Sequence, residues 1–378
     1  MTISRKAAAL AAAFALVLPA PASASAPPKV PIKAPIKAPG TPVRTEPLAE
    51  SLRLAGAGTS LAIWYRSTGH DGRPTVVSGT LALPAGRPPA GGWPVVSFGH
   101  GFGGIADACA PSRTGPSPWE RAVQETLLAA GYAVAVSDYE GLGTPGDSPG
   151  IDGRSEAYDL VDIVRAARRV APVSRNWASV GYSMGGHAAL FAGALAAAYA
   201  PSLRHMGTIA MAPITQWGVQ TADPAFRDPA KPINHTIPYN GRTMPLTTPG
   251  FRAADWFTPK GLELVDLAGR ACIGEMIEAV AGLTNGDVLK DPAAATDAFA
   301  RALADDEIPV ARYPRPVYVV HGTEDVIPIA LSRMTAGQLR GAGTDVTFVP
   351  VEGADHITLL PAIATRVREW TDRLFRRR

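Results

Sequence analysis

Short apolar runs of strand length alternate with longer helical stretches over most of the chain. Apolar or alternating runs predict strands at 61–66, 75–84, 93–98, 132–138, 177–182, 207–211, 317–320 and 345–351. Helical periodicity and capping residues predict helices at 117–130, 154–170, 187–200, 328–342 and 360–375. Strands that alternate with helices are typical of an α/β fold, in which a mostly parallel central sheet has helices on both faces.

Residues 213–310 interrupt this alternation, with many prolines and aromatic residues first and helical periodicity later. Connections between strands and helices are usually only a few residues long, so a segment of this size predicts an inserted cap, or lid. The core then comprises residues 50–212 and 311–378. In a helix predicted at 271–283, four apolar residues share one face: Ile273, Met276, Ile277 and Val280. The pattern leaves open whether this face packs on the main domain or faces the substrate.

The first fifty residues predict export. Arg5 and Lys6 precede an apolar stretch at 7–18, and small residues follow, which is the pattern of a signal peptide. We predict a signal peptide at 1–24, with cleavage after Ala24 or, alternatively, Ala26. Prolines and lysines recur through residues 25–49 and predict an extended or disordered linker. No later apolar run is long enough to span a membrane, so we expect a secreted (extracellular) protein.

The net charge of +3 comes from the beginning of the chain. Arg5 and Lys6 contribute +2 and residues 27–47 contribute +3, which leaves about −2 on residues 48–378. A near-neutral folded part does not favour a nucleic-acid partner. No spacing of His, Cys, Asp or Glu resembles a metal site, and we expect neither a metal nor another cofactor. We expect a monomer.

The chain has two cysteines, Cys109 and Cys272. In an exported protein two cysteines most simply form one disulfide, which here joins the segment after a glycine-rich loop to the predicted cap. Two separate thiols are the alternative.

The clearest chemical motif is Gly181-Tyr182-Ser183-Met184-Gly185, placed between a predicted strand and a predicted helix. Strand, Gly-x-Ser-x-Gly and helix form a nucleophile elbow, in which a sharp turn exposes the serine hydroxyl. The N–H of Met184 then faces the oxygen that becomes negative during acyl transfer. A second match at 146–150 is rejected because Pro149 follows its serine and has no N–H to donate.

A serine nucleophile needs a base and an acid that orients the base. In chains with a nucleophile elbow, the acid follows the serine in sequence and the histidine comes last. His356 follows the last predicted strand, where such a base is expected. The other histidines after Ser183 are less suitably placed: His187, His205, His235 and His321. Asp325 follows the preceding strand and is the favoured acid, with Glu324 as the alternative. Asp355 is too close in sequence to His356 to orient its ring.

A second N–H for the oxyanion hole is expected from the loop after the third strand. That loop is His100-Gly101-Phe102-Gly103-Gly104, which we call the oxyanion loop. The Phe102 N–H is the predicted donor, and the Gly101 N–H is the alternative. No Lys-Ser/Thr pair follows these glycines, so a phosphate-binding loop is not favoured.

These motifs together resemble the secretory lipase family, the capped lipase-A type of α/β-hydrolase. The resemblance also rests on Cys109-Ala-Pro-Ser, on Ser137-Asp-Tyr-Glu-Gly-Leu-Gly143 and on the His-Gly-Thr-x-Asp and Ala-Asp-His motifs near the end. It implies hydrolysis of carboxylic esters, often of acylglycerols, with Ser183, Asp325 and His356 as the catalytic triad.

We therefore expect a secreted lipase or esterase with an ester or lipid substrate, and for a lipid substrate the place of encounter is an oil–water interface. Two other classes stay open. A peptidase, acyltransferase or polyesterase could use the same fold and triad, since neither fixes the acyl group. A non-catalytic binding module is the remaining alternative.

Overall fold

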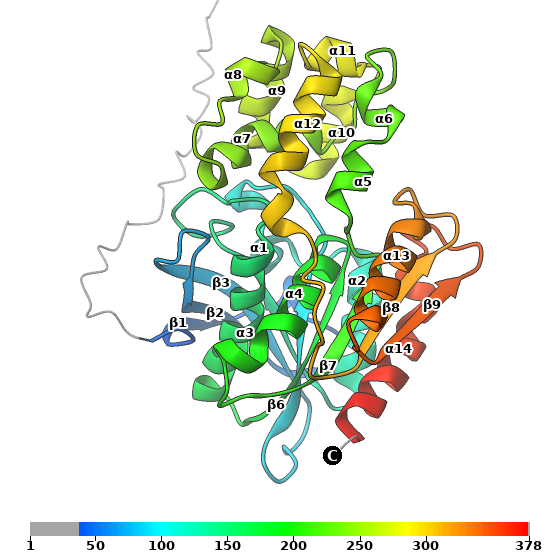
Figure 1. Ribbon diagram of the computed structural model, residues 1–378. Coiled ribbons are helices and arrows are strands. Elements are labelled where there is room, and N and C mark those ends of the chain that lie inside the picture. The colour runs from blue at the N-terminus through cyan, green and yellow to red at the C-terminus, as the bar shows by residue number, and fades with distance from the viewer. Residues whose placement is uncertain (1–37, 377–378) are drawn as a thin grey trace, which may run out of the picture. The chain divides into compact units, whose positions relative to one another are not determined.

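The computed structural model describes residues 38–376, so the predicted signal peptide and the linker residues before 38 lie outside the described part. Within this range the chain builds a nine-stranded sheet with the order β1-β2-β3-β5-β4-β6-β7-β8-β9 (Figure 1). The strands are β1 (Pro42–Pro47), β2 (Ala57–Thr68), β3 (Pro74–Pro84), β4 (Trp93–Gly99), β5 (Ala133–Ser137), β6 (Val173–Tyr182), β7 (Arg204–Met211), β8 (Val317–Gly322) and β9 (Val346–Val351).

Strand directions divide the sheet into two parts. The pairs β1–β2, β2–β3 and β3–β5 are antiparallel, whereas every pair from β5 to β9 is parallel. Parallel neighbours need crossover connections, and helices provide most of them here. The prediction of an α/β fold with a mostly parallel sheet is confirmed.

The predicted linker ends too late. Residues 42–47, assigned to it because of their prolines, form β1 and pair antiparallel with β2, from Pro42 opposite Tyr65 to Pro47 opposite Leu61. Proline is tolerated in an edge strand because its missing N–H can face away from the ladder. Pro42 and Pro47 are the first and last residues of β1, so the residues between them can still pair with β2.

Helices cover the two faces of the sheet. One face packs against α3 (Gly153–Val170), α4 (Met184–Tyr199) and α13 (Ile329–Gly341), and the other against α2 (Pro118–Ala129) and α14 (Leu359–Arg376). The amphipathic α3 turns Leu160, Ile163 and Val164 inward. The apolar α4 is buried along most of its length, and it begins at Met184, three residues before the predicted start.

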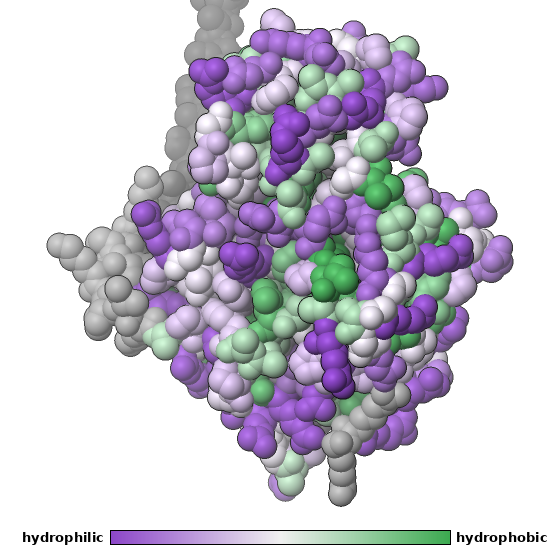
Figure 2. Space-filling model, in the orientation of Figure 1, coloured by the Kyte–Doolittle hydropathy of each residue, from purple (hydrophilic) through white to green (hydrophobic). Residues whose placement is uncertain are grey.

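The segment between β7 and β8 forms the helices that we call the cap. They are α5 (Trp217–Thr221), α6 (Pro224–Arg227), α7 (Ile237–Thr247), α8 (Ala253–Trp256), α9 (Pro259–Ala268), α10 (Ile273–Val280), α11 (Asn285–Val288) and α12 (Pro292–Ala302). Their buried side chains form a separate core around Phe257 and Phe299. The cap helices gather beyond one end of the sheet (Figure 1), and their outer surface is mostly hydrophilic in the same view (Figure 2).

Short helices complete the described chain. They are the 3-10 helices η1 (Glu50–Leu52), η2 (Asp107–Cys109) and η3 (Ala304–Asp306), and the four-residue α1 (Pro111–Thr114). The second of these follows the oxyanion loop, and the third lies where the chain returns from the cap to the core.

Candidate active site

Ser183 is the single residue between β6 and α4, and its backbone is strained. Its φ of 56° and ψ of −119° lie in a region that side-chain-bearing residues rarely adopt. The flanking glycines permit this turn: a Cβ on Gly181 would overlap the carbonyl of Gly185, and one on Gly185 would overlap the carbonyl of Gly99. Because these positions are glycines, the backbones of β4, β6 and α4 can contact one another directly. The Ser183 hydroxyl then projects from the end of the sheet.

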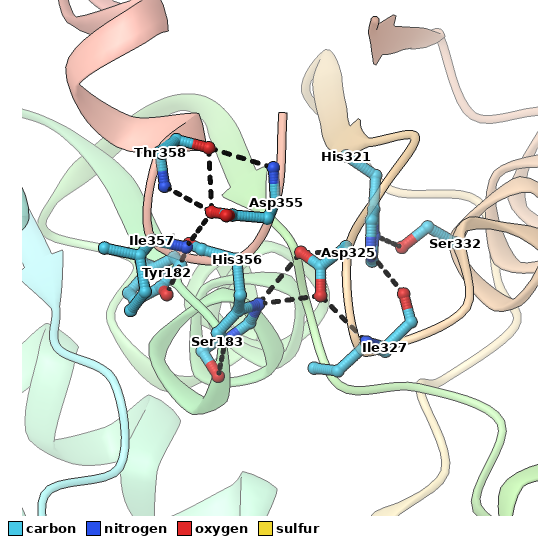
Figure 3. A network of polar contacts seen from close by, with 10 residues as sticks. All are labelled: Tyr182, Ser183, His321, Asp325, Ile327, Ser332, Asp355, His356, Ile357 and Thr358. Carbon is cyan, nitrogen blue, oxygen red and sulfur yellow. Dashed lines mark hydrogen bonds and ion pairs between the residues drawn. The ribbon is translucent and has the colours of Figure 1, made fainter. Parts of the chain in front are cut away.

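His356 lies between Ser183 and Asp325 (Figure 3). Its Nε2 is 3.1 Å from Ser183 Oγ, and its Nδ1 is 3.0 and 2.9 Å from the two carboxylate oxygens of Asp325. The Asp325 side chain is fully buried, and that of His356 is 19% exposed. A carboxylate on Nδ1 stabilises the imidazolium that forms if Nε2 takes the Ser183 proton.

The contacts in the structure favour Asp325 over Glu324 and Asp355 as the partner of His356. The Ile327 N–H donates to Asp325 Oδ1 at 2.8 Å, which fixes the carboxylate, whereas Glu324 is exposed. Asp355 instead accepts hydrogen bonds from the Thr358 N–H and hydroxyl, each at 2.7 Å. These bonds and that of the Ile357 N–H hold the pKa of Asp355 below its ordinary value.

Two side chains that the sequence did not single out support the arrangement of Ser183, His356 and Asp325. The Tyr182 hydroxyl donates to the His356 carbonyl at 2.7 Å, and the two rings lie 4.8 Å apart. His321 has Nε2 2.9 Å from the Ile327 carbonyl and Nδ1 2.8 Å from Ser332 Oγ. Burial lowers the pKa of His321, which favours the neutral ring with its proton on Nε2. Of these two residues, only Tyr182 could have been singled out from the sequence, because it lies inside the Gly-x-Ser-x-Gly motif.

The oxyanion loop and the start of α4 meet beside Ser183. The Gly101 N–H donates to Glu120 Oε1 at 2.8 Å, so this alternative donor is already occupied. No acceptor among the described residues is placed to receive the N–H of Phe102 or of Met184. Met184 is the first residue of α4, where a backbone N–H has no partner within the helix. The positive end of the α4 dipole also favours a negative oxygen there.

The cap is fastened to the oxyanion loop. Cys109 and Cys272 form a disulfide, the pair that the sequence predicted, with Cα atoms 5.5 Å apart. The Ile273 N–H donates to the Gly103 carbonyl at 2.9 Å. The rings of Phe102 and Tyr239, the latter from α7, form a T-shaped pair with their centroids 4.8 Å apart. The loop that offers the Phe102 N–H is therefore held by cap residues on one side.

The apolar face of α10 takes neither of the roles left open by the sequence. Met276 and Val280 are buried in the core of the cap itself, and Ile277 is 48% exposed. Three other apolar residues pack against both the main core and the cap core, namely Phe102, Ile151 and Ile214. The Ile214 N–H lies 3.4 Å from the Ser183 carbonyl, which places Ile214 beside Ser183.

The remaining serine and histidine candidates have other partners. Ser148 of the rejected motif accepts a hydrogen bond from the Gly150 N–H at 3.2 Å, as in a local turn. His205 lies within β7 rather than before it, and its Nε2 is 3.1 Å from Ser179 Oγ. His235 lies in the cap, and burial lowers its pKa.

His187 joins a buried polar cluster where the cap meets the core. Its Nδ1 is 3.2 Å from Glu156 Oε2 and its Nε2 is 2.8 Å from the Asp306 carbonyl. The Asp306 carboxylate accepts the Gly153 N–H at 2.8 Å. Burial lowers the pKa of His187, raises that of Glu156 and raises that of Asp306 to about 7. Neutral forms are thus favoured in this cluster.

Within residues 38–376, no group of three or more His, Cys, Asp and Glu side chains is arranged to hold a metal ion. No helix in this described range is both long and apolar enough to cross a lipid bilayer.

Comparison with known proteins bears on the fold and the family. A model of the secretory lipase family matches residues 117–223, which confirms the resemblance stated from the motifs. A Mycobacterium tuberculosis (strain CDC 1551 / Oshkosh) protein named probable inactive lipase MT1628 is 24% identical over 342 residues. The match covers 83% of this chain and 73% of that protein.

Two solved structures have the same architecture. A rice cell wall degrading esterase, LipA from Xanthomonas oryzae, is 18% identical with a TM-score of 0.71, and the match covers 89% of this chain and 97% of that one. Candida antarctica lipase A in its closed state is 20% identical with a TM-score of 0.70, covering 89% of this chain and 82% of that one. The chain has the α/β-hydrolase fold.

Proposed function

We propose that this protein is an exported serine hydrolase that cleaves carboxylic esters, a lipase or esterase. The observation that carries the proposal is His356, whose two ring nitrogens contact Ser183 Oγ at 3.1 Å and Asp325 at 2.9 Å. The family match and the lipase and esterase neighbours support the same class of reaction. The predicted signal peptide and the disulfide support export.

In the proposed reaction His356 Nε2 takes the Ser183 proton while Oγ attacks the ester carbonyl carbon. The oxygen of that carbonyl becomes negative and accepts from the N–H groups of Phe102 and Met184. The bond to the alkoxy oxygen then breaks, and His356 gives the proton to the departing alcohol. Water, deprotonated by the same ring, then attacks the acyl carbon, the bond from that carbon to Ser183 Oγ breaks, and His356 returns the proton to Oγ as the carboxylic acid leaves. Asp325 stays ionised and stabilises the imidazolium.

The name of the mycobacterial relative raises a second candidate, a protein that binds without catalysis. The contacts of Ser183, His356 and Asp325 favour an active enzyme, because each group has the partner and the distance that the reaction requires. A peptidase would keep the same triad and expel an amine in place of an alcohol, and an acyltransferase would pass the acyl group to an acceptor other than water.

The test is hydrolysis of p-nitrophenyl esters from acetate to palmitate and of emulsified triacylglycerol. We expect the wild type to hydrolyse p-nitrophenyl butyrate, Ser183→Ala to lose activity by at least about 10³-fold, and Ser148→Ala to match the wild type. Full activity of Ser183→Ala would reject the site. Activity on long chains and on the emulsion identifies a lipase, whereas activity on short soluble esters alone identifies an esterase. No hydrolysis of any ester would favour the alternatives.

A further inference from the structure

Glu120 is a buried carboxylate that links α2 to the oxyanion loop. It is the third residue of α2 and only 5% exposed. Its Oε2 completes a capping box with Ser117, accepting the hydroxyl at 2.6 Å and the N–H at 3.2 Å. Its Oε1 leaves the helix and accepts the Gly101 N–H at 2.8 Å. One side chain thus serves both the helix end and the loop.

The neighbours of Gly101 show how tightly this peptide is fixed. Its carbonyl lies 2.8 Å from His100 Nδ1. The Tyr182 ring covers the face where a side chain would project, since a Cβ on Gly101 would come within 3.1 Å of it. On the other side of Phe102, the Gly103 carbonyl accepts the Ile273 N–H at 2.9 Å. The Phe102 N–H shares its planar peptide with the Gly101 carbonyl, and the Gly101 N–H that Glu120 binds belongs to the peptide immediately before it.

We propose that Glu120 is a positioning residue for the oxyanion hole, an inference that rests on the proposed function. Its charge-assisted bond holds the Gly101 N–H away from the substrate, so that the next N–H, that of Phe102, faces the developing oxyanion. Bonds to an ionised acceptor are stronger than neutral ones. Without the carboxylate, the Gly101 N–H would lose its acceptor, and the loop would rotate to find another. Such a rotation moves the Phe102 donor.

The chain itself supplies the design of the test. In α11 the shorter Asp287 completes a capping box with Thr284 from the same third position that Glu120 has in α2. Glu120→Asp can therefore keep the cap of α2 while its carboxylate is one methylene too short for Gly101. Glu120→Gln has one acceptor oxygen. Turned toward Gly101, that oxygen keeps the loop contact, and the amide nitrogen can then donate to the Ser117 hydroxyl but no longer accepts the Ser117 N–H. Ser117→Ala weakens the cap and leaves the contact with Gly101.

The measurements are Tm, kcat and KM with p-nitrophenyl butyrate, and the inhibition constant of butylboronic acid, whose adduct with the Ser183 hydroxyl would be tetrahedral and mimic the oxyanion intermediate. Removing one oxyanion donor costs about 10²–10³-fold in kcat, and a displaced donor costs part of that. We expect Glu120→Asp to lose about tenfold or more in kcat and in boronate affinity, with KM within about twofold. Glu120→Gln should stay within about threefold, and Ser117→Ala should lower Tm while kcat stays within about twofold.

An unchanged kcat in Glu120→Asp would overturn the proposal, as would an equal loss of kcat in Ser117→Ala. A rise in KM with unchanged kcat would also overturn it, because that result means a role in substrate binding. Ser183→Ala in the same series separates this inference from the proposed function. If Ser183→Ala stays active, the proposed function fails; if it is inactive and Glu120→Asp is normal, only the role of Glu120 fails.

Discussion

Replacing both Cys109 and Cys272 with alanine removes the covalent link between the cap and the segment that follows the oxyanion loop. The two residues are 163 positions apart in sequence. Closing a loop of this length lowers the entropy of the unfolded chain by an amount worth about 5 kcal/mol at 25 °C. Cys109 is only 7% exposed, so losing its sulfur adds about 1 kcal/mol. Folded proteins are stable by about 5–15 kcal/mol, so this is a large share of the total.

The assay is equilibrium unfolding in urea, followed by tryptophan fluorescence without reductant. We expect the double variant to unfold at a lower urea concentration, with a free energy of unfolding reduced by about 4–6 kcal/mol. Reductant should shift the wild type in the same direction and leave the double variant unchanged.

A decrease below about 1 kcal/mol would refute this reasoning, because the unfolded chain would then gain little freedom from loss of the cross-link. The single variants Cys109→Ala and Cys272→Ala control for packing. Each removes the whole cross-link, so each should lose nearly as much stability as the double variant.

Two further predictions concern buried carboxylates. Asp325→Asn should reduce kcat by about 10³–10⁴-fold, because the amide favours the wrong tautomer of His356. Tm should change little, because the amide oxygen still accepts the Ile327 N–H. Steady-state kinetics and thermal unfolding measure the two effects. Burial raises the pKa of Asp306 to about 7, above its ordinary value of 3.8, so the folded chain keeps a proton that the unfolded chain releases as pH rises. The stability of the wild type should therefore fall as the pH rises from about 4 to about 7. Asp306→Asn can still accept the Gly153 N–H but cannot titrate, so Tm measured from pH 4 to pH 8 should depend less on pH in this variant. Equal slopes in the two proteins would contradict the assignment.

Local patterns in the sequence predicted much of the fold and the composition of the candidate site. Apolar strands and amphipathic helices are encoded over short stretches, so the order of the main strands and helices of the core, from β2 to α14, could be predicted directly, whereas most cap helices could not. The nucleophile elbow is equally local, because Gly181 and Gly185 are needed within one turn of Ser183. Chain order then nominated His356 and Asp325, which the structure brings together with Ser183.

Several choices that the sequence left open, or got wrong, depend on residues far away in the chain. The proline-rich stretch at 42–47 is a strand only because β2 offers it an edge to pair with. Glu120 occupies the Gly101 N–H and thereby distinguishes Phe102 as the free donor of the loop. Met276 and Val280 of α10 pack inside the cap, which has a core of its own, whereas Ile277 on the same predicted face is exposed.

The sequence by itself thus determined the α/β fold, the strained serine turn and the residue types of the candidate site, since each depends on spacing within a few residues. Tertiary structure decided which carboxylate meets His356, which N–H remains free, and how the cap is fastened to the oxyanion loop. These outcomes depend on contacts between segments up to 163 residues apart, as for Cys109 and Cys272. Only packing brings such segments together, and no local pattern records it.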